Sequence, residues 1–271
     1  MTEIFTPIAG PLRPARFVER PNRFVVRCRL ESAGPEGNTP GHVTEGVDPS
    51  GPEYSEGSIH SSAGDVVEAH IPDRGRLEAV LVPGRRLWLR PSADPTRRTA
   101  WSALLAENPS GTGLLSLDTT LPNRLIAQAL RAGALDEVEG WTLERAEWSR
   151  GPSRFDFLLT NEGRRLVLEV KSVGLVEDGV AYFPDGVTAR GTRHLRELAE
   201  IAGEDGWEAA VLFVVQRDDA RLVRPAVHID PGFADALADA ARAGVRILGR
   251  RCHVGLEGVT LAEPVPVDCG G

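Results

Sequence analysis

The chain has 271 residues, of which 41% are hydrophobic and 26% are charged, so it can bury one or two ordinary hydrophobic cores. No apolar run approaches the ~20 residues of a membrane span, and the first residues have neither a basic start nor a long apolar stretch. We therefore expect a cytoplasmic protein that does not associate with membranes.

The net charge of −8 is divided unevenly along the sequence. Residues 31–70 contain eight acidic residues and no lysine or arginine, so this stretch alone accounts for the whole net charge. Residues 1–30 and 71–101 carry 13 arginines against five acids, whereas residues 102–271 carry 18 basic and 26 acidic residues. Positive charge concentrated in one small module is typical of polyanion binding, because neutralising phosphates releases counterions. A solvated basic surface is the alternative.

An acidic insertion interrupts the first module at residues 32–64. It is rich in Gly, Pro, Ser and Glu and has few large apolar residues, so burial cannot offset the entropy lost on ordering it. We interpret it as a disordered or loosely packed surface loop. Competition with nucleic acid for the surrounding arginines is the alternative role.

Short strands are predicted on both sides of this insertion. Residues 23–30, 65–71 and 86–90 are β-rich or alternate between polar and apolar side chains. Five or so strands of this kind favour a small barrel such as the OB-fold, which commonly binds single-stranded nucleic acid. Residues 1–101 are therefore predicted to form an OB-like nucleic-acid-binding domain.

Residues 102–271 show a different order of elements, which predicts a mixed α/β domain. A helix is expected near residues 124–134, followed by three antiparallel strands. The predicted strands are 141–148, 153–160 and 164–171. They are followed by a hairpin at 175–183, a helix at 188–202, an apolar strand at 209–216, a helix at 231–243 and a strand at 245–248. The predicted class of the whole chain is α/β with a small β-barrel.

Lys171 is the only lysine in the chain, because every other basic residue is arginine. An ammonium group is a compact charge that can approach a water or a phosphoryl oxygen, whereas a guanidinium prefers forked contacts. Glu169 stands two residues earlier on the same predicted strand, so both side chains point to one face. The alternative is a surface ion pair between Glu169 and Lys171, together with a second ion pair between Asp156 and Arg154.

Asp156 lies on the preceding predicted strand, between Phe155 and Phe157. Alternation along a strand places these two aromatic rings on one face and Asp156 on the other. If the two strands pair through the turn at residues 161–163, Asp156 meets Glu169 on that face.

Two carboxylates this close repel each other unless a cation neutralises them. Mg²⁺ takes hard oxygen ligands and is commonly held by one or two carboxylates plus substrate phosphate, and Mn²⁺ is a possible substitute. We therefore expect Asp156 and Glu169 to bind the metal, which would activate water and offset charge on a phosphodiester. Lys171 would orient the attacking water or stabilise the developing charge, and Glu144 is a candidate third acid.

Seven phrases follow one another along the chain: RPNRF (20–24), AHIPDRGRL (69–77), LDTTLPNRL (117–125), SRFDFLL (153–159), LEVKSV (168–173), FPDGVTARGTRHLREL (183–198) and FVVQR (213–217). Together they resemble the bacterial sugar fermentation stimulation protein family. The resemblance implies an N-terminal OB-like domain and a C-terminal domain similar to the PD-(D/E)XK restriction-endonuclease fold, here residues 102–271. It also implies DNA binding, which is the usual description of the family.

Carried over by position, the resemblance implies a nuclease-like signature formed by Asp156, Glu169 and Lys171. It implies that Glu144 stands where a further acid often joins the site. It also places Gln216 at the end of a strand from which related nucleases often reach toward the site.

The chain departs from the family pattern at three places. Asp73 stands where asparagine is expected, and Gly174 stands where threonine is usual. Most members also lack the insertion at residues 32–64. None of these departures touches the candidate metal ligands.

Arginines of both modules are predicted to contact nucleic acid: Arg20, Arg23, Arg74, Arg76, Arg97, Arg98, Arg154, Arg190 and Arg193. The last two lie at the start of a predicted helix, where backbone N–H groups suit a phosphate. His194 follows them, and we expect a solvated or capping role for it at least as readily as general base chemistry.

Three functions remain open on the sequence. The first is a Mg²⁺-dependent nuclease acting on single- or double-stranded DNA, with RNA not excluded. The second is a non-catalytic DNA-binding regulator of sugar catabolism genes that retains a nuclease-like fold. The third, a structural or protein-interaction role, leaves the arginine-rich module unexplained. The presence of all three catalytic residue types favours the first.

Overall fold

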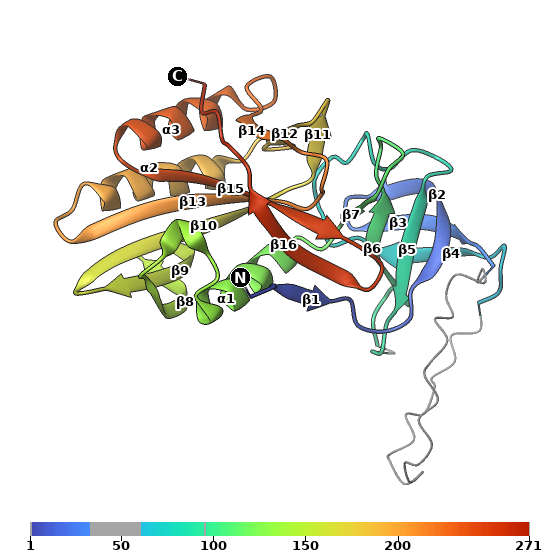
Figure 1. The fold of residues 1–271 in the computed structure, drawn as a ribbon. Helices are drawn as coiled ribbons and strands as arrows, with labels where there is room; N and C mark the ends of the chain where they lie inside the picture. The colour runs from blue at the N-terminus through green and yellow to red at the C-terminus, as the bar shows by residue number, and fades with distance from the viewer. Residues whose placement is uncertain (1, 33–60, 95, 271) are drawn as a thin grey trace, which may run out of the picture.

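The structure, a computed structural model, describes residues 2–32, 61–94 and 96–270. It contains two domains that lie side by side (Figure 1). The acidic insertion predicted at residues 32–64 falls almost entirely outside the described residues. Within the described ranges, no helix is long and apolar enough to cross a membrane.

The first domain is a closed five-stranded barrel, as predicted. Its strands are β2 (Arg13–Asn22), β3 (Val25–Leu30), β4 (Val66–His70), β5 (Arg86–Pro91) and β6 (Trp101–Glu107), with β7 (Leu114–Ser116) attached to β6. They neighbour one another in the order β4-β3-β2-β5-β6-β7, and β4 also pairs with β6, which closes the barrel. Alternation along β3 buries Val26, Cys28 and Leu30 inside and turns Arg27 and Arg29 outward.

The barrel extends further along the chain than the predicted boundary between residues 101 and 102. That boundary falls at the first residue of β6, so the first domain continues to Ser116. Strand β2 escaped prediction because its ten residues include Pro14 and Pro21, and a proline cannot donate to a ladder. Pro21 falls within one of the two register shifts between β2 and β3, whereas Pro14 lies opposite Trp88 of β5 in a regular register.

The second domain is built on a seven-stranded mixed sheet. Its strand order is β1-β16-β15-β13-β10-β9-β8. The strands are β1 (Phe5–Pro7), β8 (Thr142–Arg150), β9 (Ser153–Asn161), β10 (Arg164–Val173), β13 (Trp207–Val215), β15 (Arg246–Val254) and β16 (Gly258–Pro264). Only the pairs β10–β13 and β13–β15 are parallel. A smaller sheet joins β11 (Leu175–Glu177), β12 (Val180–Phe183) and β14 (Leu222–Pro225).

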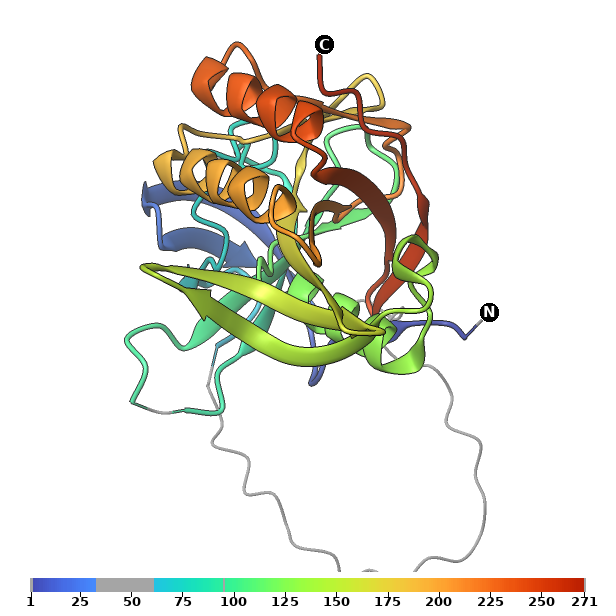
Figure 2. The same cartoon turned by 90° about the vertical axis from the view of Figure 1, so that its left-hand side faces the viewer.

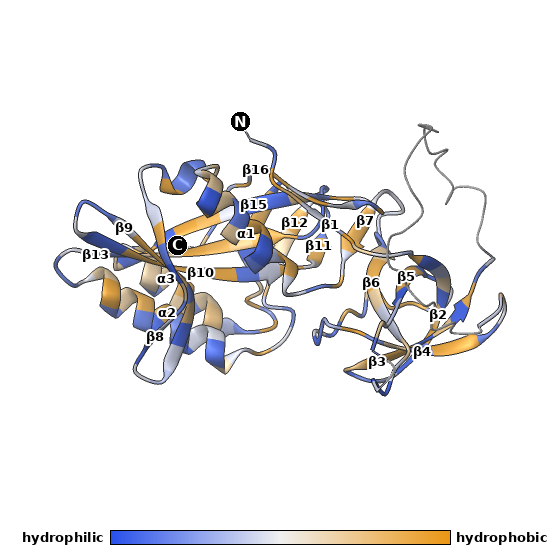
Figure 3. Cartoon of the chain, turned by 90° about the horizontal axis from the view of Figure 1, so that it is seen from below, coloured by the Kyte–Doolittle hydropathy of each residue, from blue (hydrophilic) through white to orange (hydrophobic). Residues whose placement is uncertain are grey.

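Helices cover both faces of the large sheet. Helix α1 (Leu121–Ala132) lies on one face, while α2 (Ala189–Ala202) and α3 (Pro231–Arg242) lie on the other (Figure 2). Each of α2 and α3 carries alternating hydrophilic and hydrophobic bands along its length (Figure 3), as expected for a helix with one face on a core. A short 3-10 helix spans Asp136–Val138.

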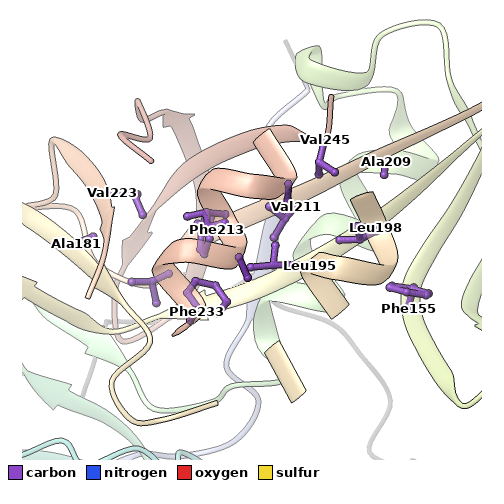
Figure 4. Packing of buried hydrophobic residues seen from close by; sticks show 14 of the residues in the cluster. Phe155, Ala181, Leu195, Leu198, Ala209, Val211, Phe213, Val223, Phe233 and Val245 are labelled. Atoms are coloured by element: carbon purple, nitrogen blue, oxygen red, sulfur yellow. The ribbon is translucent and has the colours of Figure 1, made fainter. Parts of the chain in front are cut away.

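Strand β13 is buried on both of its faces, which explains its uninterrupted apolar sequence. Val211 and Phe213 join the cluster under α2 and α3, whereas Ala210 and Leu212 join the cluster under α1. Figure 4 shows the first cluster, in which Phe155 lies at one end of the labelled group. The sheet is thus a rigid base on which the neighbouring strand β10 is held.

The predicted helices begin and end close to where the structure has them. Thr188 Oγ1 accepts a hydrogen bond from Gly191 N at 3.1 Å at the start of α2, and Asp230 Oδ1 accepts one from Phe233 N at 3.0 Å at the start of α3. Pairing between β1 and β16 was not predicted, because it joins segments some 250 residues apart (Phe5 opposite Thr260). This pairing ties the N-terminal residues to the second domain before the chain enters the barrel (Figure 1).

Candidate functional site

The hairpin of β9 and β10 brings the two predicted metal-binding carboxylates together. Its paired register ends with Leu168 opposite Phe157. Asp156 and Glu169 occupy the next position of the same register, where the strands separate. Val170 N donates to Asp156 Oδ2 at 2.7 Å, so a side-chain carboxylate replaces a backbone acceptor at the point where the ladder stops.

Asp156 reaches this place by a local break in strand alternation. The expectation that Phe155 and Phe157 share a face is wrong, because Phe155 packs in the cluster under α2 and α3 and Phe157 in the cluster under α1. The break falls where β9 stops pairing with β10, beyond Phe157, while its pairing with β8 continues. Asp156 therefore lies between the two faces, where Asn123 Nδ2 of α1 donates to its Oδ1 at 2.6 Å.

Glu169 is buried on the α2 side of β10, with only 4% of its surface exposed. Its Oε1 accepts from Lys171 Nζ at 2.5 Å and makes a second hydrogen bond, 2.7 Å long, with His194 Nδ1. Its Oε2 is buried and has no hydrogen-bond partner among the described residues. A buried carboxylate oxygen without a hydrogen-bond donor is costly, so this atom distinguishes Glu169 from a carboxylate whose two oxygens are both paired.

Lys171 shares a face with Glu169, as the strand spacing predicted. Its side chain is 13% exposed, so the pair is buried rather than a surface ion pair. The other half of that alternative also fails, because Arg154 lies 3.7 Å from Glu147 and Asp156 is held by Asn123. The lysine thus places its charge against the carboxylate site, inside the protein.

His194 is a site residue that the sequence interpretation missed. It is 1% exposed and contacts Glu169, whereas the sequence left a solvated or capping role open beside general base chemistry. Arg190 Nε donates to His194 Nε2 at 3.4 Å. That nitrogen therefore accepts, which assigns the proton to Nδ1 and makes the histidine a donor to Glu169. A usable signal was present: His194 precedes Leu198 by four residues, so it falls in the apolar stripe of α2.

The pKa values of the two carboxylates are shifted in opposite directions. Burial, together with repulsion from Glu169, raises the pKa of Asp156 above its usual range. Burial also acts to raise the pKa of Glu169, but the hydrogen bond from His194 and the charge of Lys171 outweigh it, and the net pKa is lowered. Glu169 is thus the firmly ionised member of the pair, and Asp156 is the one closer to protonation.

Two further predicted residues are not brought to the carboxylates. Glu144 is exposed at a register shift of the edge strand β8, across from the Leu158–Leu159 part of β9. Gln216 is buried just after β13, and its Nε2 donates to Ser172 Oγ at 2.9 Å. Its Oε1 has no partner among the described residues. Gln216 therefore supports the end of β10 beside Lys171 rather than the metal-binding candidates.

Arg20 has a structural role: its guanidinium group binds backbone carbonyls, whereas the sequence predicted a contact with nucleic acid. Its Nη1 donates to the carbonyls of Gly75 at 2.6 Å and Arg76 at 2.9 Å. Its Nη2 donates to the carbonyls of Arg23 at 3.0 Å and Asp73 at 3.1 Å. All four terminal N–H groups are therefore used to hold the loop at residues 73–76 against the β2–β3 hairpin.

The other predicted nucleic-acid arginines carry exposed guanidinium groups: Arg23, Arg74, Arg76, Arg97, Arg98, Arg154, Arg190 and Arg193. Arg97 Nη1 donates to Ser102 Oγ at 3.3 Å, and Arg193 lies 3.8 Å from Glu197 on the same helix. Exposed contacts of this kind contribute little and leave the guanidinium able to exchange partners.

A cavity of about 550 Å³ lies where the two domains meet. The barrel contributes His70, Asp73 and Arg74 to its wall, and the second domain contributes Ser172, Tyr182 and Asp185. Ser172 directly follows Lys171 on β10. Ser172 thus links the cavity wall to the carboxylate site along β10, although Asp156, Glu169 and Lys171 do not line the cavity.

Two acidic side chains face each other across this junction. Asp73 Oδ1 accepts from Gly75 N at 2.8 Å. A side chain on Gly75 would place its Cβ 1.6 Å from Asp185 Oδ2, so the two domains approach there through bare backbone. Burial raises the pKa of Asp73 to about 6, with a smaller contribution from Asp185, and Arg20 acts in the opposite direction.

Both domains match models of one protein family. Residues 18–114 match the model described as the SfsA N-terminal OB domain, and residues 120–258 match the one described as the sugar fermentation stimulation protein RE domain.

Known proteins resemble the whole chain. A sugar fermentation stimulation protein homologue of Shouchella clausii is 40% identical over 257 residues, covering 95% of this chain and 97% of that protein. A homologue from Moorella thermoacetica is 44% identical over 255 residues, with 93% and 95% coverage. The solved structure of Pyrococcus furiosus SfsA in complex with Ca²⁺ matches with a TM-score of 0.77 at 26% identity, covering 99% of this chain and 100% of that one.

The raised pKa of Asp73 predicts a stabilising substitution. A carboxyl group with a raised pKa binds its proton more tightly in the folded than in the unfolded chain, so its contribution to stability falls as the pH rises from about 4 to about 6. Asp73→Asn keeps the acceptor for Gly75 N and removes the buried charge. We expect the free energy of unfolding to rise by roughly 1–3 kcal/mol at pH 8, with no difference below pH 4.

Urea unfolding of both proteins at the two pH values measures this effect. Glu78→Gln, an exposed acid of the same domain, is the control and should leave stability nearly unchanged. A variant Asp73→Asn that is less stable than the parent at pH 8 would contradict the account.

Proposed function

The chain belongs to the sugar fermentation stimulation protein family, and on that premise we propose that it is a DNA-binding protein that hydrolyses phosphodiester bonds with a divalent metal ion. The barrel would hold the nucleic acid, and the β9–β10 hairpin would carry the chemistry. Mg²⁺ is the expected ion, with Mn²⁺ as a substitute.

One observation supports this proposal above the others. Glu169 Oε2 is buried without a partner among the described residues, beside a second carboxylate, Asp156. Two cationic or donor groups, Lys171 and His194, already occupy the other oxygen of Glu169. The protein therefore keeps this carboxylate ionised and leaves one of its oxygens open, which suits a cation better than a hydrogen-bond donor.

The donor set fits magnesium or manganese. Within the described residues, no group of three or more His, Cys, Asp or Glu side chains could hold a metal. A site made of Asp156 and Glu169 would therefore supply only two carboxylates. Mg²⁺ often binds with one or two carboxylates and completes its shell with water and phosphate oxygens. A divalent ion bound there lowers the pKa of water and offsets the charge that builds on a phosphodiester.

The surrounding residues would orient these ligands and supply charge. Asn123 and Val170 N fix the two oxygens of Asp156, and His194 fixes Oε1 of Glu169. Hydrogen bonds of this kind, made to a metal ligand by neighbouring groups, set the direction in which the carboxylate presents its free lone pairs. Lys171 would orient the attacking water, or donate a hydrogen bond to a phosphoryl oxygen and so stabilise the developing charge, since its Nζ has more than one N–H group.

The second candidate function is a DNA-binding regulator without catalysis. The names of the curated relatives refer to sugar fermentation and not to cleavage. Glu144, the candidate third acid, is also exposed and set apart from the carboxylates. A site with two carboxylates could bind an ion for structural reasons alone.

A cleavage assay separates the two functions. We expect the protein to cut DNA in the presence of Mg²⁺ or Mn²⁺, and Asp156→Asn and Lys171→Met to lose activity by about 10²-fold or more, the effect of removing a positioned group from the reacting centre. DNA affinity should change far less than activity in either variant, because most of the proposed phosphate contacts lie on the barrel. Glu144→Gln is the matched control, because its exposed carboxylate should be dispensable.

Two outcomes would count against the nuclease. Full DNA binding with no cleavage by the parent protein would support the regulator instead. Cleavage by Asp156→Asn at the parent rate would place the chemistry elsewhere.

Metal binding predicts a change in thermal stability. An ion that binds only the folded state stabilises it by ~2.7 kcal/mol at a concentration of about 100 times Kd. We expect Mn²⁺ to raise the Tm of the parent protein and to raise that of Glu169→Gln far less, because the amide presents no charge. The control is Glu177→Gln, an exposed residue of β11. An equal Mn²⁺-dependent rise in Glu169→Gln would exclude Glu169 as a ligand.

A further inference from the structure

An aromatic ring stands at the tip of the β2–β3 hairpin between two guanidinium groups. Phe24 lies between the last residue of β2 and the first of β3 and is 37% exposed. The Cζ of Arg23 is 5.1 Å from the centre of its ring, and that of Arg74 is 5.0 Å away. Hairpin tips usually carry small polar residues, so a phenylalanine there has no role in the turn itself.

The position of this ring is fixed by hydrogen bonds on several sides. Phe24 N donates to Asn22 Oδ1 at 2.9 Å, and its carbonyl accepts from Ile71 N at 2.9 Å. Arg20 bridges the carbonyls of Arg23 and Asp73. The hairpin and the loop at residues 73–76 are therefore joined, and the backbone that carries the ring is held before any ligand arrives, which lowers the entropic cost of binding.

The charges beside the ring are not balanced by a carboxylate of the described residues. Neither Arg23 nor Arg74 is ion-paired with a carboxylate within the part of the chain that the structure describes. Two positive groups on one exposed ring repel each other and attract an anion. A partner that offers both a flat aromatic surface and a phosphate satisfies the three side chains together.

We propose that Phe24, with Arg23 and Arg74, is a stacking platform for an unpaired nucleobase, so that the protein takes single-stranded DNA at this point. The inference rests on the proposed DNA-binding function and specifies its ligand. In duplex DNA the faces of the bases are covered by their neighbours, and only an unpaired base can lie on a side-chain ring. The two guanidinium groups contact the phosphates on either side of that base.

The platform leads toward the carboxylate site. Arg74 and Gly75 form part of the wall of the cavity between the domains, and Ser172 forms part of the opposite wall. Ser172 is the residue after Lys171. A strand that stacks on Phe24 and enters the cavity thus comes to the end of β10, close along the chain to Lys171.

The test compares Phe24→Ala and Phe24→Trp in binding to fluorescein-labelled single-stranded and double-stranded DNA of the same sequence, by fluorescence anisotropy. Loss of one stacked base weakens binding by roughly 5- to 150-fold. We expect Phe24→Ala to lose affinity in this range for the single strand and to keep its affinity for the duplex. Phe24→Trp restores single-strand affinity, because it keeps an aromatic face. The salt dependence is unchanged in both variants, since no phosphate contact is removed.

Phe5→Ala is the matched control, because Phe5 is an equally exposed phenylalanine on β1 of the other domain; it leaves both affinities unaltered. Equal single-strand affinity in Phe24→Ala and the parent would overturn the platform while the DNA-binding function stands. Equal losses for single strand and duplex would overturn it as well, since they indicate a contact that does not need an unpaired base. A parent protein that binds neither DNA overturns the proposed function itself, together with this inference.

Discussion

The site depends on an ionised carboxylate that the protein buries. Glu169 is 4% exposed, and a charge removed from water at that depth is costly unless cations and donors surround it. Lys171 two residues along β10 and His194 on α2 meet that need, and both contact the same oxygen. The second oxygen has no hydrogen-bond partner among the described residues, and on the proposed function it is the atom that a cation would contact.

The architecture of the second domain serves this arrangement. Strand β10 is flanked by the fully buried β13 on one side and by β9 on the other, and its pairing with β9 stops where the carboxylates meet. The barrel reaches the same region through the loop that Arg20 holds, and Gly75 allows its backbone to meet Asp185 without a side chain between them. On the proposed function, nucleic-acid contacts and chemistry would lie on two sides of this one junction.

Much of this could be predicted from the sequence, for physical reasons. The hairpin that joins Asp156 and Glu169 follows from two alternating strands and a short turn, and Lys171 stood out because the chain otherwise uses arginine. His194 was missed because the role of a histidine in the apolar stripe of a helix depends on which side chain of the neighbouring strand it contacts. The sequence alone does not show that contact. Glu144 was included because position along a strand does not tell which side of a register shift a residue falls on.

Anomalous diffraction from crystals containing Mn²⁺ tests the central claim most directly, because it locates the ion without relying on activity. The account predicts a peak at bonding distance, about 2.0–2.2 Å for an ion of this class, from Glu169 Oε2 and from an oxygen of Asp156. Mn²⁺ ordered elsewhere in the molecule, with Glu169 Oε2 bonded only to protein or water, would contradict it.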